Sequence, residues 1–94
     1  MSTLHIEHPI SDFVTWKVAF DRAAPLRAKG QVRAYDIHQP VDDLAYVLVR
    51  LEFDDESTAR AFLTTLEQLW KNPEVAPALR GIPRARILER RERA

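Results

Sequence analysis

The sequence predicts an α+β fold in which two helices cover one face of a four-stranded antiparallel sheet. Two stretches, 12–24 and 54–70, repeat apolar residues at helical spacing. Four other stretches alternate or run apolar as strands do, and they are residues 3–8, 31–39, 45–53 and 82–91. The resulting order is βαββαβ, the ferredoxin-like plan. A chain of 94 residues without internal repeats is expected to form a single domain over 1–94.

The first half of the chain contains one strand and one interrupted helix. The strand ends at Pro9, and Ser11 is the expected N-cap of the helix, with Asp12 at its positive end. Pro25 interrupts the helix because proline removes a backbone donor, and Gly30 is expected to end the short helical turn that follows. The apolar face of this helix comprises Phe13, Trp16, Phe20, Ala23 and Ala24.

The two middle strands flank a turn. The segment PVDDL (40–44) contains a proline and two aspartates, which are typical turn residues. The strand after it begins with an apolar run from Ala45 to Val49, so both of its faces carry apolar side chains. Alternation assigns Val47, Val49, Leu51 and Phe53 to the helix side, and Tyr46, Leu48, Arg50 and Glu52 to the outer side.

The second helix begins after an acidic pair, and Asp54 or Asp55 is its expected N-cap. It ends before Asn72, because Pro73 cannot continue it. Its apolar stripe comprises Ala59, Phe62, Leu63, Leu66, Leu69 and Trp70. We expect a short helical turn over 74–80, a chain release at Gly81 and the last strand over 82–91.

The outer face of the sheet predicts a homodimer. A strand whose outer side met water would seldom carry five apolar residues in a row, and the chain has no third helix to cover it. A second copy packed sheet on sheet would cover it. Residues 36–56 hold seven acids and one base, and residues 80–93 hold six arginines and two acids. This division either steers two copies together or is neutralised by solvent and by pairing within one chain.

Alternation also assigns many polar side chains to the outer face. They are too numerous for a dry interface, so they either pair with one another or line a wet cavity. The polar set comprises His5, Glu7, Asp36, His38, Arg50, Glu52, Arg84 and Arg86. The side chains of these strands expected on the helix side are Leu4, Ile6, Tyr35, Ile37, Ala85 and Ile87.

Composition excludes several classes of function. Fourteen basic residues balance fourteen acidic ones, which argues against nucleic-acid binding. The absence of cysteine excludes disulfides, thiolate metal sites and a cysteine nucleophile. Two glycines cannot build a glycine-rich phosphate loop. No apolar run is long enough for a membrane span and the N-terminus lacks the pattern of a signal peptide, so a cytoplasmic protein is expected.

Histidine supplies the candidate catalytic groups. His8 and His38 are the candidates for acid–base catalysis, since imidazole titrates near neutral pH. The structural alternative is that His8 orients the turn before Pro9 and that His38 only flanks the hairpin. His5, Glu7, His8, Asp36 and His38 include ligand types for a metal, but their short and common spacing does not favour one, and neither a metal nor another cofactor is expected.

Aromatic and arginine side chains are the candidate substrate-binding groups, namely Trp16, Phe20, Tyr35, Arg50 and Trp70. Trp16 and Phe20 lie one helical turn apart and would form a wall for a flat ligand, although such a pair more often belongs to the core. Trp70 would act as a lid or lie in the dimer contact. The arginines either bind a carboxylate or enolate or pair with the acids of the outer face, and they are Arg33, Arg50, Arg84 and Arg86.

Several segments resemble those of a known superfamily. The longest is HPISDFVTWKVAFD (8–21), and the others are Pro25 to Arg27, Gly30, the acidic pair 42–43, LEFDD (51–55), ARAF (59–62) and GIPRARILE (81–89). Together they resemble the dimeric α+β barrel superfamily, which includes antibiotic-biosynthesis monooxygenase-like and polyketide cyclase-like proteins. The resemblance implies a homodimer whose two sheets form one barrel, with a cavity between sheet and helices in each subunit.

The resemblance implies a function that handles a small molecule. The expected activity is that of a cofactor-independent monooxygenase-like or cyclase-like enzyme acting on an aromatic or polyketide-type compound, with the cavity near His8, Trp16, Phe20 and His38. The alternative is a non-catalytic dimeric binding or structural module. Oxygenases of the superfamily are associated with a cavity asparagine, whereas the only asparagine here is Asn72, at a predicted helix end.

Overall fold

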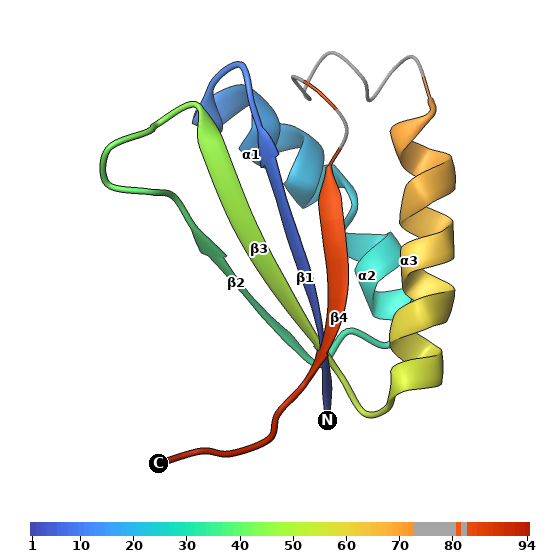
Figure 1. The fold of residues 1–94 in the computed structure, drawn as a ribbon. Coiled ribbons are helices and arrows are strands. Elements are labelled where there is room, and N and C mark those ends of the chain that lie inside the picture. Colours follow the sequence, from blue (N-terminus) through green and yellow to red (C-terminus); the bar gives the residue numbers. More distant parts are fainter. Residues whose placement is uncertain (73–80, 82) are drawn as a thin grey trace.

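The computed structural model describes residues 1–72, 81 and 83–94, and it confirms the ferredoxin-like α+β fold. Figure 1 shows one curved sheet layer with the helices on one side of it. The expected turn over 74–80 lies outside the described residues. The elements are β1 (Ser2–Pro9), α1 (Phe13–Arg22), α2 (Ala24–Lys29), β2 (Ala34–His38), β3 (Tyr46–Phe53), α3 (Glu56–Trp70) and β4 (Arg84–Glu89).

The sheet is antiparallel in the order β2-β3-β1-β4. Leu4 lies opposite Leu51 of β3 and Ile87 of β4, so these three side chains form one layer on the helix side. The four β3 residues predicted to face the helices are each at most 3% exposed, which confirms their assignment to that face: Val47, Val49, Leu51 and Phe53. The core therefore lies between this face and the helices, and its members include Leu4, Ile6, Val47, Val49, Leu51, Phe53, Ala59, Phe62 and Leu66.

Carboxylates cap both long helices. The expectation of Ser11 as N-cap is wrong: Asp12 caps α1, and its Oδ1 accepts from the Thr15 backbone N–H at 2.8 Å. The helix begins later because the Ile10 N–H donates to the Ala45 carbonyl at 2.8 Å, which holds the chain in the sheet up to residue 10. For α3, the structure selects Asp55 from the acidic pair.

The predicted interruption at Pro25 divides one helix into two. Pro25 lies in the first turn of α2, where its missing N–H costs nothing. Gly30 ends α2 as expected, but its φ is −79°, and Gln31 takes the left-handed conformation at φ 65°. Glycine is needed at position 30 for space, since a Cβ there would lie 2.3 Å from Cδ1 of Phe62.

The outer strands are shorter than the sequence predicts. Periodicity assigns 31–39 and 82–91, whereas β2 covers Ala34–His38 and β4 covers Arg84–Glu89. The Val32 N–H donates to the Arg27 carbonyl at 3.1 Å, so the first residues of the expected strand bond to the end of α2. Beyond β4 the chain leaves the sheet (Figure 1). None of the helices in the described part of the chain could cross a membrane.

Candidate functional site

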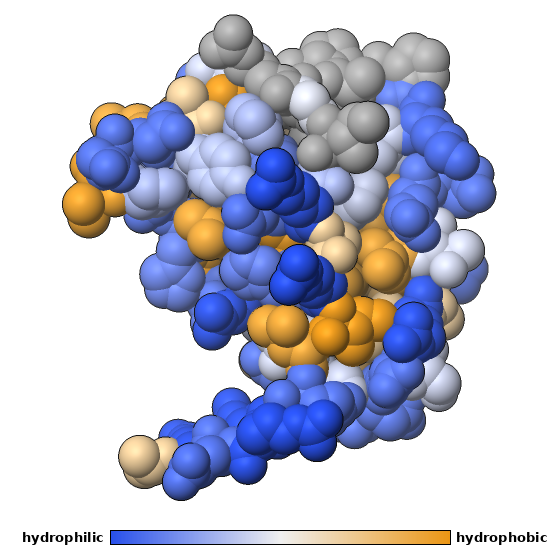
Figure 2. Space-filling model, viewed as in Figure 1, coloured by the Kyte–Doolittle hydropathy of each residue, from blue (hydrophilic) through white to orange (hydrophobic). Residues whose placement is uncertain are grey.

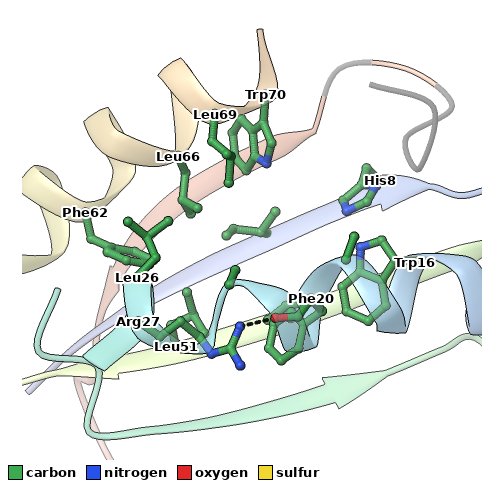
Figure 3. A pocket seen from close by; sticks show the side chains of 14 residues that line it. His8, Trp16, Phe20, Leu26, Arg27, Leu51, Phe62, Leu66, Leu69 and Trp70 are labelled. Carbon is green, nitrogen blue, oxygen red and sulfur yellow. Dashed lines mark hydrogen bonds between the residues drawn. The ribbon is translucent and has the colours of Figure 1, made fainter. Parts of the chain in front are cut away.

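A pocket of about 90 Å³ lies between the sheet and all three helices. Its wall comes from β1, β3, α1, α2 and α3 (Figure 3). Most of the side chains that line it are aliphatic or aromatic. Two are exceptions, His8 from the end of β1 and Arg27 from α2. Its lining, apolar with a few placed polar groups, has the composition of small-molecule sites, while its volume is below the about 300–1,000 Å³ usual for them.

His8 supplies a base to this pocket. Alternation along β1 places it on the same face as Leu4 and Ile6, and only 3% of the residue is exposed. Its Nδ1 lies 3.0 Å from the Pro9 carbonyl oxygen, which can only accept, so Nδ1 carries the hydrogen and neutral Nε2 carries the lone pair. Burial lowers the pKa of His8, while the bond to Pro9 opposes that shift in part.

The second nitrogen of His8 is available to a ligand. No described residue hydrogen-bonds Nε2, whereas every fully buried polar side-chain atom of the described residues has a partner. Nε2 is therefore not sealed off by protein. An uncharged imidazole with an open lone pair in an apolar pocket is suited to proton abstraction.

Aromatic rings form one wall beside His8. The His8 and Trp16 ring centroids are 6.2 Å apart, and Trp16 stacks on Phe20 with centroids 5.1 Å apart and planes 29° from parallel. Trp70 of α3 lines the same pocket from the side of the second long helix. The three aromatic residues predicted as a ligand wall or lid are thus brought together around one space.

Arg27 is a charged residue of the pocket wall that was not predicted as a site residue. It is only 9% exposed, and its Nη1 donates to the Phe20 carbonyl at 2.6 Å. Its Cζ lies 3.8 Å from the Phe20 ring centroid and 5.1 Å from that of Tyr35. Arg27 lies seven residues after Phe20, but the break at Pro25 hides that spacing from a periodicity argument.

Three predicted site residues lie outside the pocket. Tyr35 is 48% exposed on the helix side and places its ring edge-on to Phe20 at 5.1 Å, behind Arg27. His38 and Arg50 lie on the outer face of the sheet, because His38 pairs with Leu48 and Arg50 with His5. A single cavity holding both His8 and His38 is therefore wrong: alternation directs the two imidazoles to opposite faces.

Part of the polar set of the outer face pairs internally, which bears out the pairing alternative for those side chains but not for Arg84 and Arg86. Glu7 accepts from the Tyr46 hydroxyl at 2.7 Å and bonds Nε2 of His5 at 2.8 Å. These hydrogen bonds, with that of His5 first, lower the pKa of Glu7, and the bond to Glu7 raises the pKa of Tyr46. Thr3 donates to Glu52 at 2.9 Å. Among the residues described, no cluster of three or more His or acidic side chains could hold a metal ion.

The described lining of the pocket includes neither Arg33 nor Arg50, and it does not include Asn72. Arg33 pairs with Asp54 at 2.7 Å, rather than with an acid of the outer face. The Arg50 Nε lies 3.4 Å from Nδ1 of His5, at the long limit of a hydrogen bond. Asn72 follows α3 by two residues and is not among the described residues lining the pocket. The oxygenase-type asparagine has no counterpart in this part of the pocket wall.

The burial of His8 makes stability depend on pH. Above its ordinary pKa of 6.5, His8 is neutral in both folded and unfolded chains. Below 6.5 the unfolded chain takes up a proton before the folded one does, so the free energy of unfolding falls until pH reaches the lower folded pKa. We expect urea titrations at about pH 7.5 and pH 5.5 to show this loss, and His8→Gln to reduce it. His38→Gln, which removes an exposed imidazole, is the control. An equal loss in wild type and His8→Gln would contradict the assignment.

Comparison with known proteins gives the fold. No family model matches the chain, and no curated protein matches it. Among solved structures it is similar to SnoaB, a cofactor-independent oxygenase from Streptomyces nogalater, with 12% identity, a TM-score of 0.76 and coverage of 98% of this chain and 94% of that one. A Streptomyces coelicolor monooxygenase in complex with nanaomycin D gives 15% identity, a TM-score of 0.71 and coverage of 99% and 89%.

A third structure extends the comparison. It is a dimeric ferredoxin-like protein from an uncultured marine organism, with 13% identity, a TM-score of 0.66 and coverage of 99% of this chain and 97% of that one. All three matches span almost the whole chain at low identity, so they establish the architecture. The chain shares the ferredoxin-like fold of these three structures, which is the fold that the resemblance in its sequence implies.

Proposed function

We propose that the chain binds a flat, enolisable aromatic compound in the pocket and that His8 removes its acidic proton. In this step the C–H bond of the substrate breaks, an N–H bond forms at Nε2, and the electron pair stays on the substrate as an enolate. Such an anion is the common starting point for oxygenation or for ring closure. The proposal thus covers both the monooxygenase-like and the cyclase-like activity.

The observation that carries this proposal is the state of His8. His8 is buried, and its Nδ1–H is hydrogen-bonded to the Pro9 carbonyl. It is therefore held as the neutral tautomer whose Nε2 carries the lone pair. The adjacent Trp16 and Phe20 rings provide an apolar surface for a flat ligand. The fold neighbours named as a cofactor-independent oxygenase and a ligand-bound monooxygenase favour a reaction of this class.

Deuterium exchange tests the step directly. Phenylacetone has one ring and an enolisable CH₂ group, whose exchange in D₂O is followed by proton NMR. We expect the protein to accelerate this exchange and His8→Gln to lower the acceleration by about 100-fold or more, in the range of general base catalysis. His38→Gln should leave the rate unchanged. Binding without accelerated exchange would support the non-catalytic binding module instead, and an unaltered rate in His8→Gln would remove His8 from the role of base.

We further propose that the protein is a homodimer joined through the outer face of its sheet. Figure 2 views this face and shows hydrophobic groups among the hydrophilic ones, including the hairpin between β2 and β3. Val41 and Leu44 of that hairpin are 101% and 71% exposed, and Leu88 of β4 is 38% exposed. Burial of these side chains by a second copy would be favourable. The dimeric ferredoxin-like neighbour supports this assembly.

Charge favours the same partner. The strand order β2-β3-β1-β4 places the acidic segment 36–56 toward one edge of the sheet and the basic end of the chain along the other. A two-fold axis lying between the two packed sheets and parallel to their strands would bring the acidic edge of one copy over the basic edge of the other. The pairing of Glu7 with His5 and Tyr46 lets this polar centre be buried at lower cost.

A further inference from the structure

Arg27 carries a positive charge that the described protein does not neutralise. The residue is 9% exposed, yet none of the ion pairs among residues 1–72, 81 and 83–94 includes it. Buried charges in proteins are generally paired, because removal from water is costly without a counter-charge. Arg27 is therefore a cation at the wall of an apolar pocket with no counter-charge among the described residues.

Neutral groups hold this cation in place. The Phe20 carbonyl takes one N–H of the guanidinium at 2.6 Å, and the rings of Phe20 and Tyr35 lie against it at 3.8 and 5.1 Å. These contacts fix its orientation through hydrogen bonding and cation–π attraction, but they add no negative charge. A guanidinium has five N–H donors, so most of them remain available. They are not sealed in protein, since every fully buried polar side-chain atom of the described residues has a partner.

A purely structural role accounts for only part of this arrangement. The bond gives the Phe20 carbonyl, near the end of α1, a second donor beside the Ala23 N–H at 3.1 Å, and a cation at a helix C-terminus commonly bonds such a carbonyl. That task requires a single N–H. An exposed cation such as Arg22, in the last turn of α1, could donate that N–H. The task therefore does not require an arginine whose side chain lines the pocket. The remaining fork of donors matches the two oxygens of a carboxylate.

The pocket has a second polar group at a different point of its wall. Figure 3 shows His8 and Arg27 apart, with Trp16 and Phe20 between them. The contacts run without a gap from His8 to Trp16, from Trp16 to Phe20 and from Phe20 to Arg27. A ring lying along this wall would direct one end to the base and the other to the cation.

We propose that the pocket selects an anionic aromatic acid, whose carboxylate pairs with Arg27 while its enolisable carbon faces His8. This inference rests on the proposed function and names its substrate class, an aryl-substituted keto acid. His8 is neutral at pH 7, because its pKa lies below 6.5, so the polar lining has a net charge of about +1 and favours a monoanion.

A matched pair of probes tests the selection. Phenylpyruvate and phenylacetone share the ring and the enolisable CH₂ group and differ in the carboxylate. Both tryptophans of the chain line the pocket, so their fluorescence reports binding. We expect wild-type protein to bind phenylpyruvate about 10- to 100-fold more tightly than phenylacetone, as a charge-assisted pair predicts. Arg27→Met keeps an apolar stem and should reduce this ratio to near one.

Two further variants separate binding from folding. Arg27→Lys keeps the charge without the fork and should give an intermediate ratio. Arg22→Met removes an exposed arginine of α1 and should leave the ratio unchanged. Lower stability of Arg27→Met would alter binding of both probes alike, whereas the ratio reports the carboxylate alone. An equal ratio in wild type and Arg27→Met would overturn the inference but leave the proposed function intact. Failure of both probes to bind wild type would overturn both.

Discussion

Val49→Asp will unfold the protomer, whereas the same change at its neighbour Leu48 will leave a folded monomer. Val49 is 3% exposed in the core between sheet and helices, and a carboxylate there has no partner. The cost of burying it is several kcal/mol, comparable with the about 5–15 kcal/mol that stabilises a small domain. Leu48 lies half-buried on the outer face, which the proposed second copy would cover.

Sedimentation and circular dichroism measure the two effects separately. Wild type is expected to sediment as a dimer at micromolar concentration, and Leu48→Asp near the chain mass of 10.9 kDa with its far-ultraviolet spectrum retained. Val49→Asp should lose that spectrum. A monomeric wild type, or an intact dimer in Leu48→Asp, would show that the outer face is not the interface.

Gly30→Ala is expected to destabilise the fold by about 1–3 kcal/mol, the usual range for overpacking. At φ −79° alanine fits the backbone of residue 30, so the effect comes from contact alone. The added methyl would lie 2.3 Å from Cδ1 and 2.7 Å from Cε1 of Phe62. That ring is 3% exposed, packs on Phe53 at 5.6 Å and lines the pocket, so the added methyl would push it out of its packed position toward the pocket.

A double-mutant cycle identifies the cause. Phe62→Leu removes the ring atoms that meet the new methyl, and in that background Gly30→Ala should cost less than in wild type. Urea titrations of the four proteins give the coupling. Additive losses would show that Gly30 is required for another reason than the approach of Phe62.

Residues of β1 and β3 show why the fold was predictable. Their inward and outward side chains alternate, so the buried set on β3 and the polar set around Glu7 could be assigned from the sequence. The structure also places His8 beside Trp16, as expected for the cavity, because β1 ends next to the start of α1. These inferences depend only on local geometry, which a sequence carries.

The N-cap of α1 and the place of Arg27 could not be predicted from local sequence patterns. The N-cap moved to Asp12 because a hydrogen bond to Ala45, distant in sequence, extended the pairing of β1. Arg27 entered the pocket because α2 changes direction after Ala23, which brings its side chain back to Phe20. The angle between two short helices is decided by tertiary packing, and no pattern within one helix encodes it.

The interruption of the helix at Pro25 also makes the length of this segment critical. Each residue of an α-helix turns the chain by about 100°. An insertion or deletion of one residue between Ala23 and Arg27 would therefore rotate the guanidinium away from Phe20, while β1 and β3 could remain as they are. The insertion or deletion of a single residue at the junction of α1 and α2 would thus change the charge of the pocket. Related chains that differ in length here would be expected to favour neutral ligands on the same scaffold.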